Sequence, residues 1–515
     1  MRLLVLCPAL LSLLAVHAQP GSPDPTFGGD GTVVVDIGNG SNDQAHDVAF
    51  QTDGKAVMVG YTGTSNQDFC VVRLHPDGTL DNSFGGDGKV TTEVNGVSDR
   101  ARSVAIQADG RIVVAGHVVA GGGYDIALVR YHPDGTLDNG FSADGKLTID
   151  VDGDDLALSV VVQPDGRILA AGRSESTDHE RFTLVRLLED GTPDPAFGNG
   201  GIAQAAFLPE DDATGWDIAL QPDGKVVMVG HASDGTYQQF AMARFNADGT
   251  LDADFGSGGT ATFGLGIADD IARAVALQPD GGIVVTGYTS DGINEQYLAI
   301  RLLANGILDP SFGSTGSVAL PVTGHDTPHG VVVQPDGRIV LAGYSHTGIQ
   351  RVFSSVRLNV DGSPDNTYDS DGMLLLPVGS VEDRCFNLTL APNGRLAMVG
   401  YSDGSNSTDF ALAMVLSGLS MGVEDPGTHA VVMTASPNPV IDRTTLILDL
   451  PRAMHLDARL LDAQGRAVRS ICERCPFPAG QNGMPLDLTG LAAGPYTAVV
   501  LATSEPVAVL RLFKR

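Results

Sequence analysis

One sequence module recurs seven times along most of this 515-residue chain, and its period constrains the fold more than any other feature. An aromatic residue in a Ser-Phe-Gly-like triplet returns every 56 to 58 residues, and a Gln-Pro-Asp-Gly-like turn returns in register with it. The aromatic residues are Phe27, Phe84, Phe141, Phe197, Phe255, Phe312 and Tyr368. Two anchors with one period indicate a true repeat, which in a Gly-rich, β-rich chain indicates a closed or stacked array.

Residues 85–140 serve as the example of one repeat. Runs of strand-forming residues at 89–94, 103–107, 111–116 and 125–131 predict four strands, and Asp109-Gly110 predicts a tight hairpin turn between the second and third. Four strands in each of seven copies predict an all-β, seven-bladed β-propeller. We expect the connector that contains the aromatic residue to cross from the outer edge of one blade to the axis of the next.

The two ends of the repeat region predict a closed ring. The last copy ends at Leu416 with no connector behind it, whereas the chain begins with an unmatched connector and strand at 23–35. We therefore expect the N-terminal strand to complete the last unit. An open solenoid would need polar caps at both ends.

The first 18 residues have the features of a secretory signal peptide. A basic start is followed by an apolar run and by Val16-His17-Ala18, with small residues where cleavage is expected. The run is too short for a stable membrane anchor, and no other stretch approaches a membrane span. We divide the chain into a signal peptide (1–18), a propeller (19–417), a linker (418–431) and a C-terminal domain (432–515).

Residues 432–515 alternate between apolar and polar positions, with breaks at Gly, Asn and Pro, which predicts a small antiparallel β-sandwich. The segment resembles the type A sorting domain of the type IX secretion system found in the Bacteroidetes lineage. The motifs that match are Pro437-Asn438-Pro439, Asp462 to Arg466, Leu488 to Leu491, Gly494-Pro495-Tyr496 and the Lys514-Arg515 end. The resemblance implies that the type IX machinery is a partner, and that the protein reaches the cell surface or the medium.

The repeats at 22–417 resemble the delta-60 repeat family, a propeller-type repeat of unassigned function in secreted bacterial proteins. The shared pattern is Gln-Pro-Asp-Gly-Lys/Arg-Ile-Val, then Val-Arg-Leu, then Asp-Gly-Thr-Leu-Asp-x-Ser-Phe-Gly. The resemblance implies no catalytic residue.

The negative charge of the chain belongs to the repeats. Residues 19–417 contain 53 acidic and 21 basic residues, whereas 432–515 is close to neutral. Such a body disfavours nucleic acid as a partner and favours cations or basic ligands. The alternative interpretation is that the acidity only keeps an exported protein soluble.

Four cysteines follow the signal peptide. Cys70 and Cys385 occupy positions that hold small residues in other copies, so we expect buried thiols. Cys472 and Cys475 form one CxxC pair, which is too few ligands for a structural zinc site. In an exported protein the pair predicts a local disulfide.

Two sets of polar residues recur with the period of the repeat. Connector aspartates are predicted to pair bidentately with strand arginines and to fix each connector in place. The arginines are Arg73, Arg130, Arg186, Arg244, Arg301 and Arg357, and the aspartates are Asp24, Asp81, Asp138, Asp194, Asp252, Asp309 and Asp365.

The second set is acidic and precedes the second strand of each copy. It comprises Asp43, Asp99, Asp155, Asp212, Asp270, Asp326 and Asp383. Carboxylates clustered on one face suit Ca²⁺ or a cationic ligand. The alternative is that each aspartate caps its own loop through backbone N–H groups.

These features predict an exported propeller that acts as a binding, adhesion or structural module, with a glycan or protein ligand on the variable-loop face. The alternative function is an extracellular hydrolase or lyase that acts on polymers. Gly400-Tyr401-Ser402-Asp403-Gly404 has the spelling of a nucleophile elbow, but it follows a predicted strand and enters a hairpin. Most polar residues repeat, whereas a catalytic site needs residues particular to single blades near the axis, so we name no catalytic residue.

Overall fold

The computed structural model describes residues 19–419, except 39, 96–97, 177–178, 208–211, 234 and 405–406. It also describes 432–514, except 437–441, 451–453, 462–466, 479, 493 and 503–504. The chain divides into two compact units, Met1–Leu419 and Ser420–Arg515. The expected signal peptide, nearly all of the linker, and the Pro437-Asn438-Pro439 and Asp462 to Arg466 motifs lie outside the described residues.

The described part of the first unit is built from antiparallel four-stranded sheets. The first three comprise β2 (Gln44–Phe50), β3 (Ala56–Thr62), β4 (Asp68–Leu74) and β5 (Lys89–Thr92); β6 (Asp99–Ile106), β7 (Ile112–Ala120), β8 (Gly123–Tyr131) and β9 (Lys146–Ile149); and β10 (Asp155–Val162), β11 (Ile168–Ser176), β12 (His179–Leu187) and β13 (Ile202–Ala205).

Three further sheets follow in chain order. They comprise β14 (Ala213–Leu220), β15 (Val226–Ser233), β16 (Gln238–Phe245) and β17 (Thr260–Phe263); β18 (Asp270–Leu277), β19 (Ile283–Ser290), β20 (Glu295–Leu302) and β21 (Ser317–Leu320); and β22 (Asp326–Val333), β23 (Ile339–His346), β24 (Arg351–Leu358) and β25 (Met373–Leu376). The remaining sheet joins β26 (Glu382–Leu390), β27 (Leu396–Asp403) and β28 (Thr408–Val415) to β1 (Thr32–Val35).

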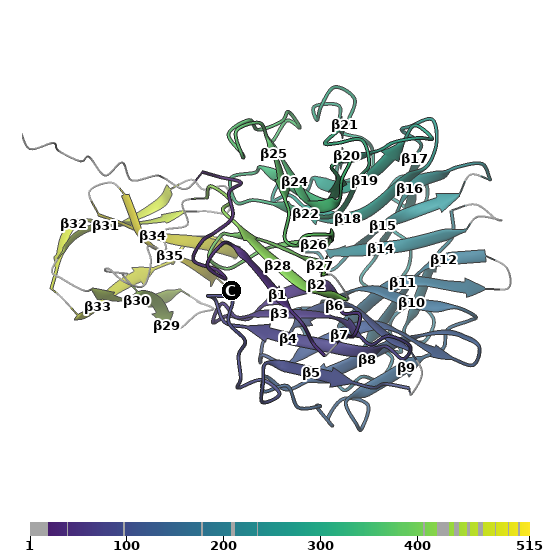
Figure 1. Ribbon diagram of the computed structural model, residues 1–515. Coiled ribbons are helices and arrows are strands. Elements are labelled where there is room, and N and C mark those ends of the chain that lie inside the picture. Colours follow the sequence, from purple (N-terminus) through teal and green to yellow (C-terminus); the bar gives the residue numbers. More distant parts are fainter. Residues whose placement is uncertain are drawn as a thin grey trace, which may run out of the picture. The chain divides into compact units, whose positions relative to one another are not determined.

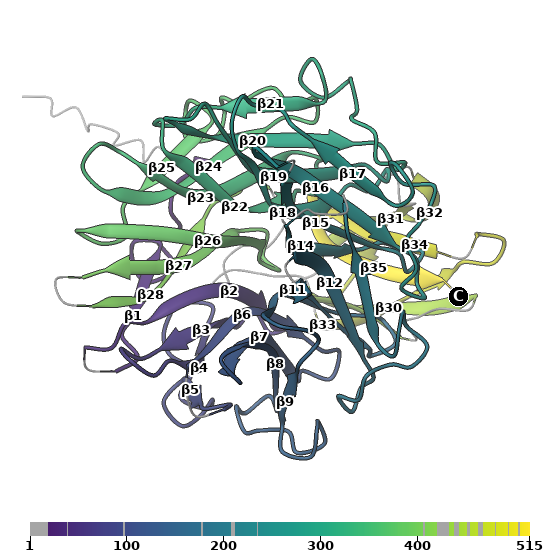
Figure 2. The same cartoon turned by 90° about the vertical axis from the view of Figure 1, so that its right-hand side faces the viewer.

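The first strand of each sheet lies beside the first strands of its neighbours, and β2 also contacts β26, so the series returns to its start. Figures 1 and 2 show the sheets following one another around a common centre. Apolar clusters lie between successive sheets, for example between β3 and β7 around the buried Phe84. These observations confirm the predicted all-β class with repeated four-stranded, propeller-type sheets.

The grouping of strands differs from the prediction made on residues 85–140. Lys89–Thr92 was expected to be the first strand of its own blade, but it pairs with β4 as the outer strand of the preceding sheet. The connector around Phe84 therefore stays within one sheet, and the loop at 93–98 crosses to the next. Sequence spacing does not distinguish these arrangements, because each gives four strands per period.

The N-terminal strand pairs with the C-terminal sheet. β1 runs antiparallel to β28, with Thr32 opposite Ala413 and Val35 opposite Phe410. Just before it, the Gly21 N–H donates to the carbonyl of Leu416 at 2.7 Å, and the Asp369 N–H donates to the carbonyl of Pro20 at 2.7 Å. Residues from both ends of the repeat region thus share one sheet.

Every inner strand contains a β-bulge at the same place. In β6 the register shifts between Ala101 and Ser103, so Arg102 is the extra residue, and the other inner strands shift at the equivalent step. A glycine of the second strand faces each bulge. A Cβ on Gly116 would lie 2.0 Å from the carbonyl oxygen of Arg100. The close approach of two backbones explains why this position is glycine in all seven sheets.

In its described residues the second unit contains two antiparallel sheets. One has the order β29 (Val432–Ser436), β30 (Arg443–Leu450) and β33 (Gly480–Asp487); the other has the order β32 (Ala467–Phe477), β31 (Met454–Leu461), β34 (Gly494–Ala502) and β35 (Glu505–Lys514). Leucines of β30 and β31 share one apolar cluster with Ala498 and Val500. Among the residues described, no helix has the length and apolar character needed to cross a membrane.

Candidate functional site

The extra residue of each bulge lines one cavity at the centre of the inner strands. The cavity has a volume of about 370 Å³, within the range of small-molecule sites. The bulged residues that line it are His46, Arg102, Leu158, Trp216, Arg273, His329 and Phe386. We call this set the axial ring. A bulge turns its extra side chain out of the regular alternation, so the fold presents one side chain per sheet to the axis.

Members of the axial ring contact their neighbours. The rings of His46 and Phe386 stack at 4.7 Å, and an Arg102 Nη1 lies 3.0 Å from His46 Nε2. On the other side, the guanidinium of Arg273 lies 3.9 Å from the centre of the Trp216 ring. Cation–π contacts are strongest with Trp and in desolvated surroundings. The cavity wall is therefore aromatic and cationic.

The lining of the cavity extends to residues at the starts of inner strands. Gln44 and Arg100, at the starts of their strands, belong to its lining, and Tyr61 donates a 2.6 Å hydrogen bond to Gln44 Oε1. Tyr61 pairs with Gln44 across the sheet, and the equivalent positions of the other second strands also carry large polar residues. They are His117, Arg173, His231, Tyr288, Tyr344 and Tyr401.

Burial controls ionisation around the cavity. Desolvation, followed by nearby arginines, lowers the pKa of His117 to about 2 and that of His231 to about 4. The same causes hold the pKa values of His46 and His329 well below the ordinary value. Burial also lowers the pKa of Arg102 to about 10. At neutral pH the histidines are uncharged and the arginines supply the positive charge.

Two carboxylates beside the axial ring are bound by protein donors. Asp47 accepts from Ser103 Oγ at 2.9 Å, from the Val104 N–H at 2.8 Å and from Asn387 Nδ2 at 2.6 Å. Asp217 accepts from Ser159 Oγ and the Val275 N–H, both at 2.9 Å. All five of these bonds join different sheets, so the two aspartates hold neighbouring inner strands together.

Sequence reasoning missed the axial ring. It noted that residues particular to single blades would have to converge on the axis, and the structure places such residues there. The available signal was one column immediately before the second predicted strand. It holds large and dissimilar residues between a small residue and a polar or small one. Without the bulge, strict alternation does not indicate which way that column points.

The acidic set predicted as a metal ring lies at the crossing loops. Asp43, Asp99, Asp155, Asp270, Asp326 and Asp383 are all buried. Each accepts from backbone N–H groups of the preceding loop; Asp99, for example, accepts from Val94 at 2.6 Å and Asn95 at 3.2 Å. These are the contacts that the capping alternative describes.

Asp212 does not belong to this set. Asp99 lies opposite Val118, and in the β14 sheet Ala213, not Asp212, takes the equivalent place opposite Ala232. Asp212 is exposed and stands one residue out of register. The crossing loop before β14 differs in sequence from the others, which is why alignment on acidic residues misplaced it.

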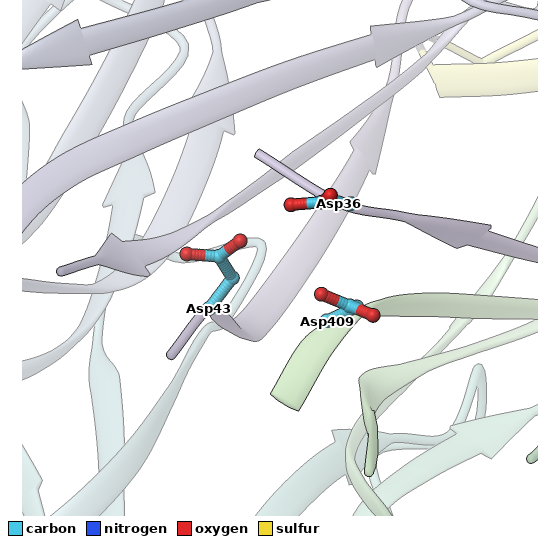
Figure 3. A group of neighbouring side chains, drawn as sticks. All are labelled: Asp36, Asp43 and Asp409. Atoms are coloured by element: carbon cyan, nitrogen blue, oxygen red, sulfur yellow. The ribbon is translucent and has the colours of Figure 1, made fainter. Parts of the chain in front are cut away.

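Two of the capping aspartates join groups of three carboxylates, in which one oxygen of each residue lies within 4.8 Å of the other two. Figure 3 shows the first group: Asp36 follows β1, Asp43 precedes β2, and Asp409 lies in β28. The second group, Asp125, Asp150 and Asp155, occupies the equivalent junction two sheets further on. Burial is the main reason why the pKa of Asp155 is raised to about 6, and the like charges of Asp150 and Asp125 act in the same direction.

The recurrent arginines and aspartates lie together in the structure. Arg73 Nε lies 2.7 Å from Asp81 Oδ2, and the same contact recurs in the other sheets that carry the arginine. The predicted bidentate geometry is wrong, because one carboxylate oxygen receives the guanidinium and the other accepts from the connector, as Ser83 shows for Asp81. The recurrent aromatic ring lies under the guanidinium, at 4.7 Å for Phe84.

Each of these arginines also reaches the next sheet. Arg73 Nη1 donates to the carbonyl of Pro133, and Arg357 Nη1 donates to that of Ser417. Where the series ends at Met414, Arg395 Nε contacts Asp24 at 2.5 Å instead. Each connector is thereby tied to its own sheet and to the following one.

Cys70 and Cys385 are not among the residues that line the cavity. Cys70 and Cys385 are buried free thiols whose pKa values burial raises. Cys472 and Cys475 are joined by a disulfide in β32.

The sequence matches a family described as a domain of unknown function (DUF5122) beta-propeller at residues 51–84, 107–141, 163–197, 221–255, 278–312 and 334–368. These matches support a repeat β-propeller. No curated protein matches the sequence.

Solved structures similar in fold include a fungal alcohol oxidase of the AA5 family in complex with copper, at 12% identity and a TM-score of 0.44, covering 94% of this chain and 98% of that one. Another is a protein of unknown function from Dyadobacter fermentans, at 14% identity and a TM-score of 0.40, covering 75% and 97%. A PL25 ulvan lyase bound to a GlcA–Rha3S saccharide has 10% identity and a TM-score of 0.40, covering 78% and 95%.

Proposed function

We propose that this β-propeller repeat protein is an exported, surface-displayed binding protein whose ligand occupies the axial cavity. One observation carries the proposal: the axial ring differs from sheet to sheet, while the bulge that presents it is the same in all seven. A side chain needed for the fold would recur, as the connector arginines do.

The axial ring has the properties of a binding site on a rigid scaffold. Its seven positions hold five residue types, which include three aromatic or imidazole kinds and arginine. Aromatic and arginine side chains supply much of the binding energy in recognition sites. The inner strands that carry them are held by buried hydrogen bonds such as Ser103 Oγ to Asp47, so the site is largely preformed.

The experiment that tests the cavity is a glycan and small-molecule screen with the full chain, followed by titration of any ligand found. Trp216→Ala and Phe386→Ala should weaken binding at least tenfold while leaving the fold intact by circular dichroism. Ile349→Ala is the matched control, because Ile349 is 90% exposed and does not line the cavity. Equal affinities in all three variants would refute the axial site.

The second candidate is an extracellular propeller lyase or hydrolase that uses the same cavity. It is favoured by His46 and His329, which line the cavity and belong to the side-chain type that most often acts as general acid or base. The screen separates the two functions, because an enzyme would release shortened products from a polymer and a binding protein would not.

The second part of the proposal concerns the cellular localisation of the protein. We propose that residues 432–515 direct the chain through type IX secretion to the cell surface or the medium. The resemblance of this segment to the sorting domain supports this, together with its compactness as a separate unit. A chain truncated after Leu419 should fold into a propeller but remain in the periplasm. Surface labelling of the truncated protein, in a host with type IX secretion, tests this expectation. Normal surface exposure would contradict the proposed role.

A further inference from the structure

We infer that the ligand of the axial cavity carries a small oxyanion, a carboxylate or sulfate group, on a ring-shaped body. The inference rests on the proposed function, since it assigns a chemical class to the ligand of that site. Its basis is the hydrogen-bonding capacity that the cavity leaves unused.

The unused capacity includes two buried guanidinium donors. Arg102 Nε and Arg273 Nε are buried, and neither has a hydrogen-bond partner among the residues that the structure describes. A guanidinium N–H can donate but never accept. Unpaired buried donors are costly to a fold, and a bound acceptor removes that cost.

The two arginines also form no ion pair with another described residue. Three other arginines of the propeller sheets pair with glutamates: Arg173 with Glu180, and Arg351 and Arg384 with Glu382. No ion pair between described residues includes Arg102 or Arg273. Burial lowers the pKa of each, which shows that the charged forms lie in poorly solvated surroundings.

The two carboxylates in the cavity are already engaged. The carboxylate of Asp47 accepts hydrogen bonds from the Val48 N–H and from donors of two other sheets. That of Asp217 accepts from the Ile218 N–H and likewise from donors of two other sheets. A ligand that offers hydrogen-bond donors therefore finds no free carboxylate among Asp47 and Asp217, whereas a ligand that offers oxyanion acceptors finds two guanidinium groups.

The rest of the molecule restricts the size of the anion. The surrounding repeats carry a large excess of carboxylates, so a long polyanion would be repelled outside the cavity. The cavity of about 370 Å³ is large enough for a sugar ring. Trp216, Phe386 and Tyr61 provide flat apolar surfaces in its wall, which suit the face of a sugar ring. A uronic acid or a sulfated sugar unit combines these features.

The test is isothermal titration of the full chain with D-glucuronate, inorganic sulfate and D-glucose. We expect glucuronate to bind more tightly than glucose, and Arg102→Gln and Arg273→Gln each to weaken it about tenfold or more, as expected for a lost charge-assisted bond. Arg351→Gln is the control, because it removes the same charge from an arginine that already has a partner. Sulfate binding without glucuronate binding would assign the site to sulfate esters.

Two outcomes would overturn the inference. One is that glucose binds as tightly as glucuronate and that Trp216→Ala abolishes this binding. The axial site would then be supported, but its ligand would be neutral. The other is anion binding that Arg102→Gln and Arg273→Gln leave unchanged. Melting temperatures of the variants are measured first. Should Arg273→Gln not fold, Arg273→Lys keeps the charge but removes the Nε donor, and is expected to weaken glucuronate binding as well.

Discussion

Arg130 Nε lies 2.7 Å from Asp138 Oδ2 in the connector that follows its strand, while Nη1 of the same side chain donates to the carbonyl of Glu189 in the next connector. One guanidinium therefore joins a strand, its own connector and the neighbouring sheet. Both side chains are almost fully buried. Although burial acts to raise it, the Gly140 N–H and Arg130 hold the pKa of Asp138 below its ordinary value.

Replacing Arg130 by Ala should lower the free energy of unfolding by about 1.5–3 kcal/mol, because it removes a buried charge-assisted hydrogen bond and leaves Asp138 with only the more exposed Arg111 as a cationic partner. The measurement is denaturant unfolding. Arg111→Gln is the control: Arg111 also contacts Asp138, at 3.1 Å, but is more exposed, so its loss should cost about 1 kcal/mol or less. Equal costs for the two variants would show that burial does not set the strength of this pair.

Deleting residues 19–37 should destabilise the whole propeller and not only one edge. The segment supplies β1, which pairs with β28, and the Pro20 carbonyl that accepts from Asp369. Losing it opens the ring between the first and last sheets and exposes both. Calorimetry should show a lower melting temperature for the propeller transition, and an unchanged temperature would contradict ring closure by this strand.

Asp155 should respond differently to two substitutions. Asp155→Ala removes the acceptor for the Val151 and Asp152 N–H groups and should cost about 0.5–2 kcal/mol, as for a lost cap. Asp155→Asn keeps an acceptor and removes a buried charge, so stability at pH 7 should be equal or higher. Asp326→Asn is the contrasting variant, because Asp326 uses both oxygens, and it should lose stability.

The effect of Ca²⁺ on the melting temperature separates capping from metal binding at these aspartates. Capping alone predicts that several millimolar Ca²⁺ leaves the melting temperature unchanged, because an ion stabilises a protein only where it binds the native state. The calcium site predicted from the sequence stays a prediction. A calcium-dependent rise that is lost in Asp125→Asn would locate it at the Asp125, Asp150 and Asp155 group.

Acidification from pH 7 to 5.5 should destabilise the propeller. Histidines of the unfolded chain titrate near 6.5, but buried His46, His117, His231 and His329 stay neutral. Below 6.5 the unfolded state binds more protons, so the free energy of unfolding falls with pH. Each such histidine contributes about 1.4 kcal/mol one unit below 6.5.

Two aspartates act in the opposite direction. Burial raises the pKa of Asp47 and of Asp155 to about 6, so the folded state binds protons there before the unfolded state does. The melting temperature as a function of pH should therefore fall less steeply in His329→Gln and more steeply in Asp47→Asn. A melting temperature that rises from pH 7 to 5.5 in the parent protein would contradict the assignment of neutral histidines.

The sequence alone determined the architecture in outline. The period of the aromatic residues and turns predicts repeated four-stranded sheets, and the unmatched strand at the N-terminus predicts its pairing partner. The sequence correctly predicted that the recurrent arginines and aspartates, such as Arg130 and Asp138, pair with each other. Residues that repeat together at a fixed offset occupy the same local geometry in every copy. Local patterns are sufficient where the same contact recurs in every copy.

The tertiary structure alone decided the strand grouping, the register of Asp212 and the existence of the axial ring. Each depends on backbone geometry that has little signature in side-chain type: pairing across sheets, one residue more or less in a crossing loop, and a bulge that redirects Arg102 or Trp216. The residues that give this propeller its individual chemistry are those that do not repeat. They acquire a common location only because seven bulged strands meet at one axis.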